Sequence, residues 1–179
     1  LHTALLQGRR SARGPSVVAW LYASLFTGLR PSEWEHARLV ASLPISESGG
    51  PYLLVKNGKH SNGRANGEMR TLDLSNFTPE QLNLIRVHLE NIKEATKTVS
   101  FAVFQSECSE TLRRVARRTW PDRARRPGLY SGRHQFSANL KKAEMPPVEI
   151  AALMGHISTK TAVNHYARKN VGRQIGTLP

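Results

Sequence analysis

The sequence is poor in cysteine and in acidic side chains. Its single cysteine, Cys108, excludes an internal disulfide, and no histidine and cysteine cluster has the close spacing of a structural zinc site. The sequence has no apolar run long enough to cross a membrane and no signal peptide, and it has neither a Walker loop nor an acidic cluster for magnesium. We therefore expect a cytoplasmic protein that uses no metal or other cofactor, in which Cys108 has no functional part.

Positive charge is present in large excess. The 179 residues include 26 Lys and Arg against 13 Asp and Glu, a formal net charge of +13. The hydrophobic content of 39% is enough for the core of one domain. A charge of this size favours a polyanionic partner, and nucleic acid is the commonest one. The alternative is a basic protein that meets nucleic acid only incidentally.

The first half of the chain predicts a lead-in, two helices and a small sheet. Residues 1–14 are basic and begin without methionine, which suggests a linker remnant of a longer protein. A helix is expected from Pro15 to Gly28, followed by a short helix from Pro31. In the first of these two helices, Val18, Leu21, Tyr22 and Leu25 fall on one face at the helical period. Strands are expected at 39–43, 52–55 and 69–74, with a basic loop at 56–67 whose three Asn-Gly pairs indicate turns.

The second half predicts helices throughout. Thr78 and Gln81 form a possible capping box for a helix whose buried stripe is Leu82, Ile85, Leu89 and Ile92. Further helices are expected at 109–119, at 131–143 with Ser131 as its cap, at 147–155, and from Ser158 through Tyr166. The expected fold is α+β and mostly α-helical, with helices packed around a small three-stranded antiparallel sheet.

Four separated segments carry residue types suited to phosphate chemistry. The segment Thr27-Gly28-Leu29-Arg30-Pro31-Ser32-Glu33 places an arginine at a helix start beside a carboxylate, and the Asn-Gly loop carries Lys59 at a bend. Tyr130-Ser131-Gly132-Arg133 adds a second arginine at another helix start. Leu153-Met154-Gly155-His156 is followed by Tyr166. Taken singly, each segment is also explained by a surface ion pair, a solvated lysine or a buried tyrosine.

The four segments in this order resemble the active-site set of the tyrosine recombinases, also called phage-type integrases. That family shows Thr-Gly-Leu-Arg-x-x-Glu, a hairpin lysine, His-x-x-Arg, and Leu-Gly-His followed by a tyrosine nine or ten residues later. The resemblance spans about residues 15–170 and implies a catalytic domain at 15–179. It also implies that the family's N-terminal DNA-clamping domain lies outside this chain, so that the fragment binds weakly and does not recombine alone.

The resemblance assigns a role to each matching residue. Arg30 and Arg133 match the two arginines that hold the scissile phosphate, with Glu33 as a supporting acid. Lys59 matches the lysine that protonates the leaving 5′-oxygen, and it fits better than Lys56. His156 matches the histidine that hydrogen-bonds the phosphate. Tyr166 matches the nucleophile, which forms a 3′-phosphotyrosine without metal or ATP.

Two positions depart from the family pattern. Tyr130 stands where the family usually has histidine, and a phenol is a poorer base than an imidazole near neutral pH. Tyr130 is therefore expected to hydrogen-bond the phosphate, with the proton passing to another group or to water. The spacing of ten residues between His156 and Tyr166 is one more than the commonest family value. The first departure leaves reduced or absent catalysis open.

The predicted partner is double-stranded DNA, on which the family assembles as a tetramer, and the family implies a bacterial, phage or mobile-element origin. The densest arginine patch, which also includes Arg123, should contact phosphates rather than read sequence. The predicted DNA-binding residues are Lys56, Arg64, Arg113, Arg114, Arg117, Arg118, Arg125 and Arg126. The alternatives are a DNA-binding module of the same fold that has lost its chemistry, a type IB topoisomerase and, more remotely, a structural or RNA-binding protein.

Overall fold

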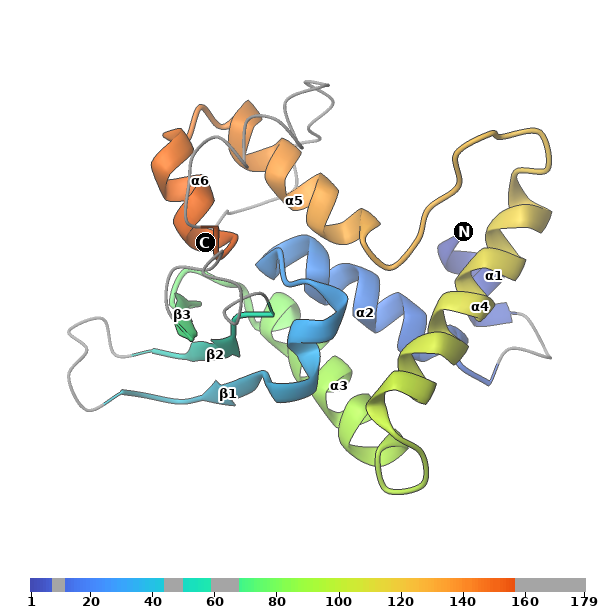
Figure 1. Ribbon diagram of the computed structural model, residues 1–179, viewed down its shortest axis with the longest axis horizontal. Coiled ribbons are helices and arrows are strands. Elements are labelled where there is room, and N and C mark those ends of the chain that lie inside the picture. The colour runs from blue at the N-terminus through green and yellow to red at the C-terminus, as the bar shows by residue number, and fades with distance from the viewer. Residues whose placement is uncertain (8–11, 44–49, 59–67, 157–179) are drawn as a thin grey trace.

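The computed structural model describes residues 1–7, 12–43, 50–58 and 68–156. Figure 1 shows a helical body with a small sheet at one end. The elements in chain order are α1 (His2–Gln7), α2 (Gly14–Thr27), the 3₁₀ helix η1 (Pro31–His36), β1 (Arg38–Val40), β2 (Tyr52–Lys56), β3 (Met69–Asp73), α3 (Pro79–Ala95), α4 (Phe101–Thr119), α5 (Ser131–Lys142) and α6 (Pro147–Leu153). The predicted α+β class, mostly helical with a three-stranded antiparallel sheet, is confirmed.

Helix α2 is the central element, and it contacts α1, α3, α4 and α5 (Figure 1). On the face that carries Val18, Leu21, Tyr22 and Leu25, Val18 is buried, Leu21 and Leu25 are partly buried, and Tyr22 is 37% exposed. Val17, Trp20 and Ala23 are also core positions. A helix surrounded on several sides buries small and polar residues as well as large apolar ones, so one apolar stripe does not describe it. The predicted end at Gly28 is confirmed by its φ of 67°.

The three strands form one antiparallel sheet in the order β1-β2-β3. Leu53 of β2 pairs with Leu39 of β1 and with Leu72 of β3. The predicted strand at 39–43 instead spans Arg38–Val40, because its pairing with β2 ends at Val40. β2 and β3 are the two arms of the predicted hairpin, and residues 59–67 of its basic loop lie outside the described residues.

Side-chain caps fix the starts of the long helices. Thr78 and Gln81 form the predicted capping box of α3. Of its predicted stripe, Ile85 and Ile92 are buried, while Leu82 and Leu89 pack partly buried against the core. Helix α4 starts eight residues before the predicted Ser109, because Ser100 accepts a hydrogen bond from the backbone N–H of Val103. Ser131 is the first residue of α5 rather than its cap, a position that Tyr130 occupies.

His88 of α3 lies in the core between two tryptophans. Its ring centroid is 4.9 Å from that of Trp20 and 4.6 Å from that of Trp34. The side chain is fully buried, and neither ring nitrogen has a hydrogen-bond partner among the described residues. Burial lowers the pKa of His88 to about 3, so the imidazole is neutral at physiological pH. The ring therefore acts as an aromatic core residue beneath η1.

The segment predicted to be a lead-in contains the short helix α1, which contacts α2 and α4. Leu5 is 1% exposed and belongs to the main hydrophobic core. A flexible lead-in therefore does not describe residues 2–7, because an apolar side chain on this turn of helix finds a packed surface to bury against. A second, smaller core joins α5 and α6 through Phe136, Leu140, Ile150 and Met154.

Candidate active site

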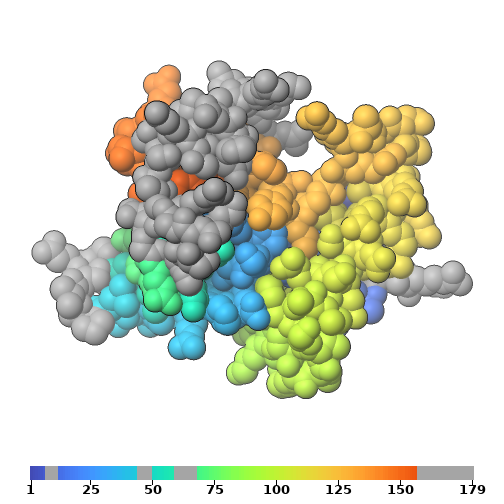
Figure 2. All heavy atoms as spheres, viewed as in Figure 1, coloured from blue at the N-terminus to red at the C-terminus, as the bar shows by residue number. Residues whose placement is uncertain are grey.

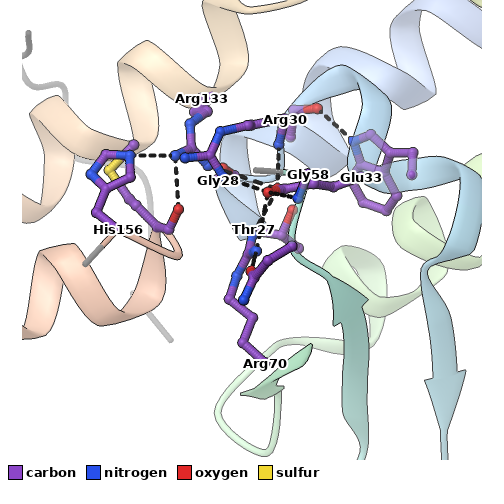
Figure 3. Close-up of polar contacts among 12 residues, drawn as sticks. Thr27, Gly28, Arg30, Glu33, Gly58, Arg70, Arg133 and His156 are labelled. Atoms are coloured by element: carbon purple, nitrogen blue, oxygen red, sulfur yellow. Dashed lines mark hydrogen bonds and ion pairs between the residues drawn. The ribbon is translucent and has the colours of Figure 1, made fainter. Parts of the chain in front are cut away.

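The Glu33 carboxylate is the centre of a buried cluster of arginines (Figure 3). Glu33 is 1% exposed. Its Oε1 accepts a hydrogen bond from Arg30 at 2.5 Å, and its Oε2 accepts one from Arg70 at 2.8 Å. The Nη1 of Arg133 lies 3.9 Å from Oε2. Three guanidinium groups, from the N-cap of η1, from β3 and from α5, thus surround one carboxylate. The three arginines and Glu33 together carry more positive than negative charge.

Arg30 is set in place by the turn that joins α2 to η1. Gly28 has a positive φ, and a Cβ there would lie 2.3 Å from the ring of Phe136. The close approach brings α5 directly against the turn. Arg30 is the N-cap of η1, and its backbone N–H donates to Glu33 Oε2 at 2.8 Å. The predicted arginine and carboxylate at a helix start therefore form a pair that is buried rather than a surface ion pair.

Arg133 is fully buried and reaches the cluster from α5. Its Nη1 donates to the carbonyl of Gly28 at 2.5 Å, and its Nη2 donates to the carbonyl of Met154 at 2.8 Å. Nη2 also lies 2.9 Å from Nε2 of His156. One guanidinium therefore joins the α2–η1 turn to the end of α6, two segments more than 100 residues apart in the sequence.

His156 lies just beyond α6, where Gly155 turns the chain with a φ of 62°. Burial, followed by the charges of Arg133 and Arg30, lowers the pKa of His156 to about 4. The imidazole is therefore neutral near pH 7. A neutral ring whose Nε2 faces an arginine N–H accepts that hydrogen bond and carries its proton on Nδ1.

Glu33 remains ionised despite its burial. Burial alone raises the pKa of a carboxylate, but the hydrogen bond and charge of Arg70, together with Arg30 and Arg133, lower the pKa of Glu33 to about 2. An ionised Glu33 orients Arg30 and Arg70, because each of them donates an N–H to a carboxylate oxygen, whereas Arg133 interacts with Glu33 through its charge at 3.9 Å.

Arg70 is a member of the cluster that the sequence analysis did not single out. Its side chain is 8% exposed, and its Nη1 donates to Glu33 Oε1 at 3.2 Å and to Asn57 Oδ1. The alternation of side chains along β3 does indicate the orientation of Arg70. Arg70 lies two residues before the buried Leu72, so both side chains face the same side of β3, toward the core.

Two of the predicted catalytic residues, Lys59 and Tyr166, and the predicted DNA-binding Arg64 lie outside the described residues. Tyr130 is described and is 46% exposed, and its ring lies 6.2 Å from that of His134. Tyr130 and Arg133 differ in burial, because Tyr130 is exposed and Arg133 is fully buried. The structure therefore brings together Arg30, Glu33, Arg133 and His156.

Four arginines of the predicted patch line a surface groove of about 950 Å³. Arg113, Arg114, Arg117 and Arg118 project from the exposed face of α4, opposite the buried Leu112, Val115 and Ala116. Figure 2 shows α4 and the chain that follows it at the surface. The groove is also lined by Arg13 and Glu107, which form an ion pair at 2.8 Å.

The remaining predicted DNA-binding residues have different surroundings. The Nζ of Lys56 lies 3.3 Å from Glu68 across the hairpin, and both side chains are largely exposed. Arg125 is exposed. Arg126 donates to the backbone carbonyls of Trp120 and Pro121, so part of its guanidinium holds the loop after α4 in place.

Within the described part of the chain, no group of three or more His, Cys, Asp and Glu side chains is placed to hold a metal ion. The helices described there also lack the combination of length and apolar character that crossing a membrane requires. Cys108 is fully buried, and burial raises the pKa of its thiol to about 12.

Comparisons with known proteins bear on the fold. No protein-family model matches the chain, and no curated protein matches it. Among solved structures, the chain is similar to the Tn1549 transposon integrase in complex with a circular intermediate DNA, with a TM-score of 0.50 and 14% sequence identity. The match covers 93% of this chain and 59% of the integrase structure. At this identity the likeness concerns the fold, so the chain shares the fold of part of a transposon integrase.

Proposed function

We propose that this chain is the catalytic domain of a tyrosine recombinase, which cleaves and rejoins DNA strands through a 3′-phosphotyrosine on Tyr166. The observation that carries the proposal is the meeting of Arg30, Arg133 and His156 around Glu33. These residues come from three segments that are far apart in the sequence. Their assembly in a fold shared with a transposon integrase is difficult to attribute to separate structural roles.

The buried arginines suit a phosphodiester better than they suit a purely structural network. Three guanidinium groups share one carboxylate, so an incoming phosphate adds the negative charge that the named groups lack. Arginine matches phosphate geometry with two parallel donors, and donors that are already fixed in place need no reorganisation as charge builds on the phosphorane.

In the proposed reaction, the phenol oxygen of Tyr166 attacks phosphorus and the bond from phosphorus to the 5′-oxygen breaks. Lys59 gives a proton to the leaving 5′-oxygen, and the phenol proton passes to water or to another acceptor. Arg30 and Arg133 stabilise the charge on the phosphorane, and neutral His156 hydrogen-bonds the phosphate. The phosphotyrosine retains the energy of the broken bond, so a second 5′-hydroxyl reverses the step on a new strand without ATP.

The exposed arginines of α4 are proposed to hold the duplex through its phosphates. Helix α2 connects the groove with the cluster. Arg13, at the start of α2, lines the groove, and Arg30, beyond the end of α2, belongs to the cluster. Its 14 residues span about 20 Å at a rise of about 1.5 Å per residue. The groove and the cluster are therefore separate sites, one for affinity and one for chemistry, on an enzyme that is proposed to assemble as a tetramer on two duplexes.

Trapping the covalent intermediate tests the proposal. We expect the chain to form an adduct with a pool of nicked duplexes of randomised central sequence, because loss of the short product beyond the nick prevents rejoining. The adduct is detected on a denaturing gel, and mass spectrometry locates the phosphodiester on Tyr166. Tyr166→Phe should give no adduct, whereas Tyr22→Phe, a matched control on the exposed side of α2, should react like the unchanged protein. An adduct that persists in Tyr166→Phe would overturn the assignment.

A second candidate is a DNA-binding module of the same fold without catalysis. The exposed Tyr130, at a position where the family usually has histidine, favours it. This candidate predicts salt-dependent binding to duplex DNA and no adduct with any member of the pool. A type IB topoisomerase would instead relax supercoiled plasmid without a specific site.

A further inference from the structure

Arg70 makes contacts that a simple surface strand residue would not make. It forms a two-pronged ion pair with Glu33, with Nη1 3.2 Å from Oε1 and Nη2 2.8 Å from Oε2. The same Nη1 donates to Asn57 Oδ1 at the end of β2. Both terminal nitrogens thus donate to protein oxygens, and the side chain is 8% exposed. Arg70 is therefore placed to hold Glu33 and Asn57 in the cluster.

The contacts of Arg70 reach three segments. Glu33 belongs to η1, Asn57 follows β2, and Gly155 precedes His156. A Cβ on Gly155 would lie 2.7 Å from Asn57 Oδ1 and 2.8 Å from Arg70 Nη1, so the backbone at this turn packs directly on the pair. Gly58 adds a further link, because its backbone N–H donates to Glu33 Oε1 at 3.3 Å. The sheet, η1 and the turn before His156 therefore meet at one guanidinium (Figure 3).

Burial of Arg70 carries an energetic cost at one of its donors. Its Nε is buried and has no hydrogen-bond partner among the residues that the structure describes. An unsatisfied buried donor costs about 1–3 kcal/mol, and a buried ion pair is weak evidence for stability alone. These conditions favour a role for Arg70 in setting the geometry of its neighbours.

We propose that Arg70 is a positioning residue of the phosphate-binding cluster. From β3 it fixes the Glu33 carboxylate, which accepts a hydrogen bond from Arg30 and lies 3.9 Å from Arg133. It also holds the end of β2 and the turn before His156 against that carboxylate. The proposal rests on the proposed function for its effect on cleavage. Its effect on anion binding is independent of whether Tyr166 reacts.

Two substitutions separate positioning from charge. Arg70→Lys keeps the positive charge but loses the planar fork that spans both Glu33 oxygens, and Arg70→Met removes the charge as well. Arg38→Lys is the matched control, because Arg38 is an exposed arginine on β1 of the same sheet. Folding of each variant is checked by circular dichroism and thermal unfolding before the functional measurements.

The first measurement is binding of orthovanadate, a phosphate analogue, followed through the NMR signals of the His156 ring. We expect Arg70→Lys to weaken vanadate binding by about tenfold, the equivalent of about 1.4 kcal/mol, while affinity for a long duplex stays within about twofold because most duplex contacts lie elsewhere. Unchanged vanadate affinity in a folded Arg70→Lys variant would overturn the proposal. So would an equal loss of vanadate and duplex affinity in Arg70→Lys, because that result would make Arg70 a direct DNA contact.

The second measurement is the pH profile of single-turnover cleavage. The groups that face Glu33 are Arg30 from η1, Arg70 from β3, and Arg133 from α5, with His156 close by. Arg70→Met removes the Arg70 charge, which is one cause of the low pKa of Glu33. The pKa of Glu33 therefore rises in this variant, into the measured pH range. We expect the acidic limb to move to higher pH in Arg70→Met, more than in Arg70→Lys. A lower rate with an unmoved limb in Arg70→Met would indicate a merely structural role.

The two proposals fail in different ways. If the unchanged protein forms no covalent adduct but Arg70→Lys still weakens vanadate binding, the positioning role stands and the recombinase chemistry does not. If the adduct forms normally in Arg70→Lys, with unchanged vanadate affinity, the recombinase proposal stands and the positioning role does not.

Discussion

The buried cluster around Glu33 and the exposed groove on α4 contain the same residue types in opposite environments. The Arg70–Glu33 and Arg13–Glu107 pairs both have an N···O distance of 2.8 Å. The side chains of the first pair are 8% and 0% exposed, whereas those of the second are 29% and 43% exposed. Equal N···O distances therefore do not imply interactions of equal strength. Water screens the groove and leaves its arginines adaptable, while burial makes each partner in the cluster indispensable to the others.

Removal of the central carboxylate should have the largest effect. We expect Glu33→Gln to lower the free energy of unfolding by about 3–5 kcal/mol, because it leaves buried guanidinium groups without their counter-charge. Glu107→Gln, the matched change in the groove, should cost less than about 1 kcal/mol. Urea denaturation measures both values. Similar losses of stability in Glu33→Gln and Glu107→Gln would mean that burial does not change the contribution of these ion pairs to stability.

The turn that delivers Arg30 provides a second contrast. Gly28→Ala should destabilise the protein by about 2–4 kcal/mol, since the new Cβ meets the Phe136 ring at 2.3 Å and occupies a left-handed conformation. Gly128→Ala, in the exposed connection after α4, meets no atom within 4 Å and should change stability by less than about 0.5 kcal/mol. Thermal unfolding compares the two. A Gly28→Ala protein as stable as the Gly128→Ala protein would contradict the close approach of α5 to this turn.

Lower pH should decrease the free energy of unfolding, because two buried histidines are neutral in the folded protein. The pKa of His156 is lowered to about 4 and that of His88 to about 3, so below pH 6.5 the unfolded chain binds protons that the folded chain does not. Stability should therefore fall as pH falls from about 6.5 toward 4, by up to about 1.4 kcal/mol per pH unit for each histidine. His88→Phe should reduce this slope in denaturation curves measured from pH 7 to pH 4.5. If His88→Phe left the slope unchanged, groups other than His88 would be taking up the protons.

The smallest effect on stability is expected in the groove. Changing Arg113, Arg114, Arg117 and Arg118 together to glutamine should alter the free energy of unfolding by less than about 0.5 kcal/mol for each site. The slope of log affinity for duplex DNA against log salt should become shallower by about 0.9 for each DNA phosphate that the variant no longer neutralises.

A control for the groove variant removes the same total charge from another surface. Arg38, Arg86, Lys93 and Lys97 are exposed cations outside the groove. Changing these four to glutamine should leave the salt slope closer to that of the unchanged protein. An equally shallow slope in both quadruple variants would show that total charge, rather than the groove, attracts the duplex.

Local sequence signals predicted much of the secondary structure correctly. The Thr78–Gln81 capping box, the glycine stop at Gly28 and the hairpin arms all depend on residues within a few positions of one another. The start of α4 was misplaced because the Ser100 cap was overlooked. The apolar face of α2 does not describe its burial, because periodicity identifies a helix but not the number of elements that pack around it.

The candidate site was predicted in part. The motif pattern named Arg30, Glu33, Arg133 and His156, and the structure places them together. The motif pattern did not name Arg70, because its role depends on strand register and on contacts with η1 and with the turn before His156. The roles of the four residues placed together, like those of Tyr130, Lys59 and Tyr166, stay predictions.

By itself, the sequence determined the helix boundaries set by caps and glycines, the positive charge, and an ordered set of arginines, histidine and tyrosine typical of one enzyme family. Only the tertiary structure decided which arginines share the Glu33 carboxylate and which lie in water on α4. The reason is that capping and periodicity act over a few residues, whereas burial and the resulting strength of a charge depend on what the rest of the chain packs around it.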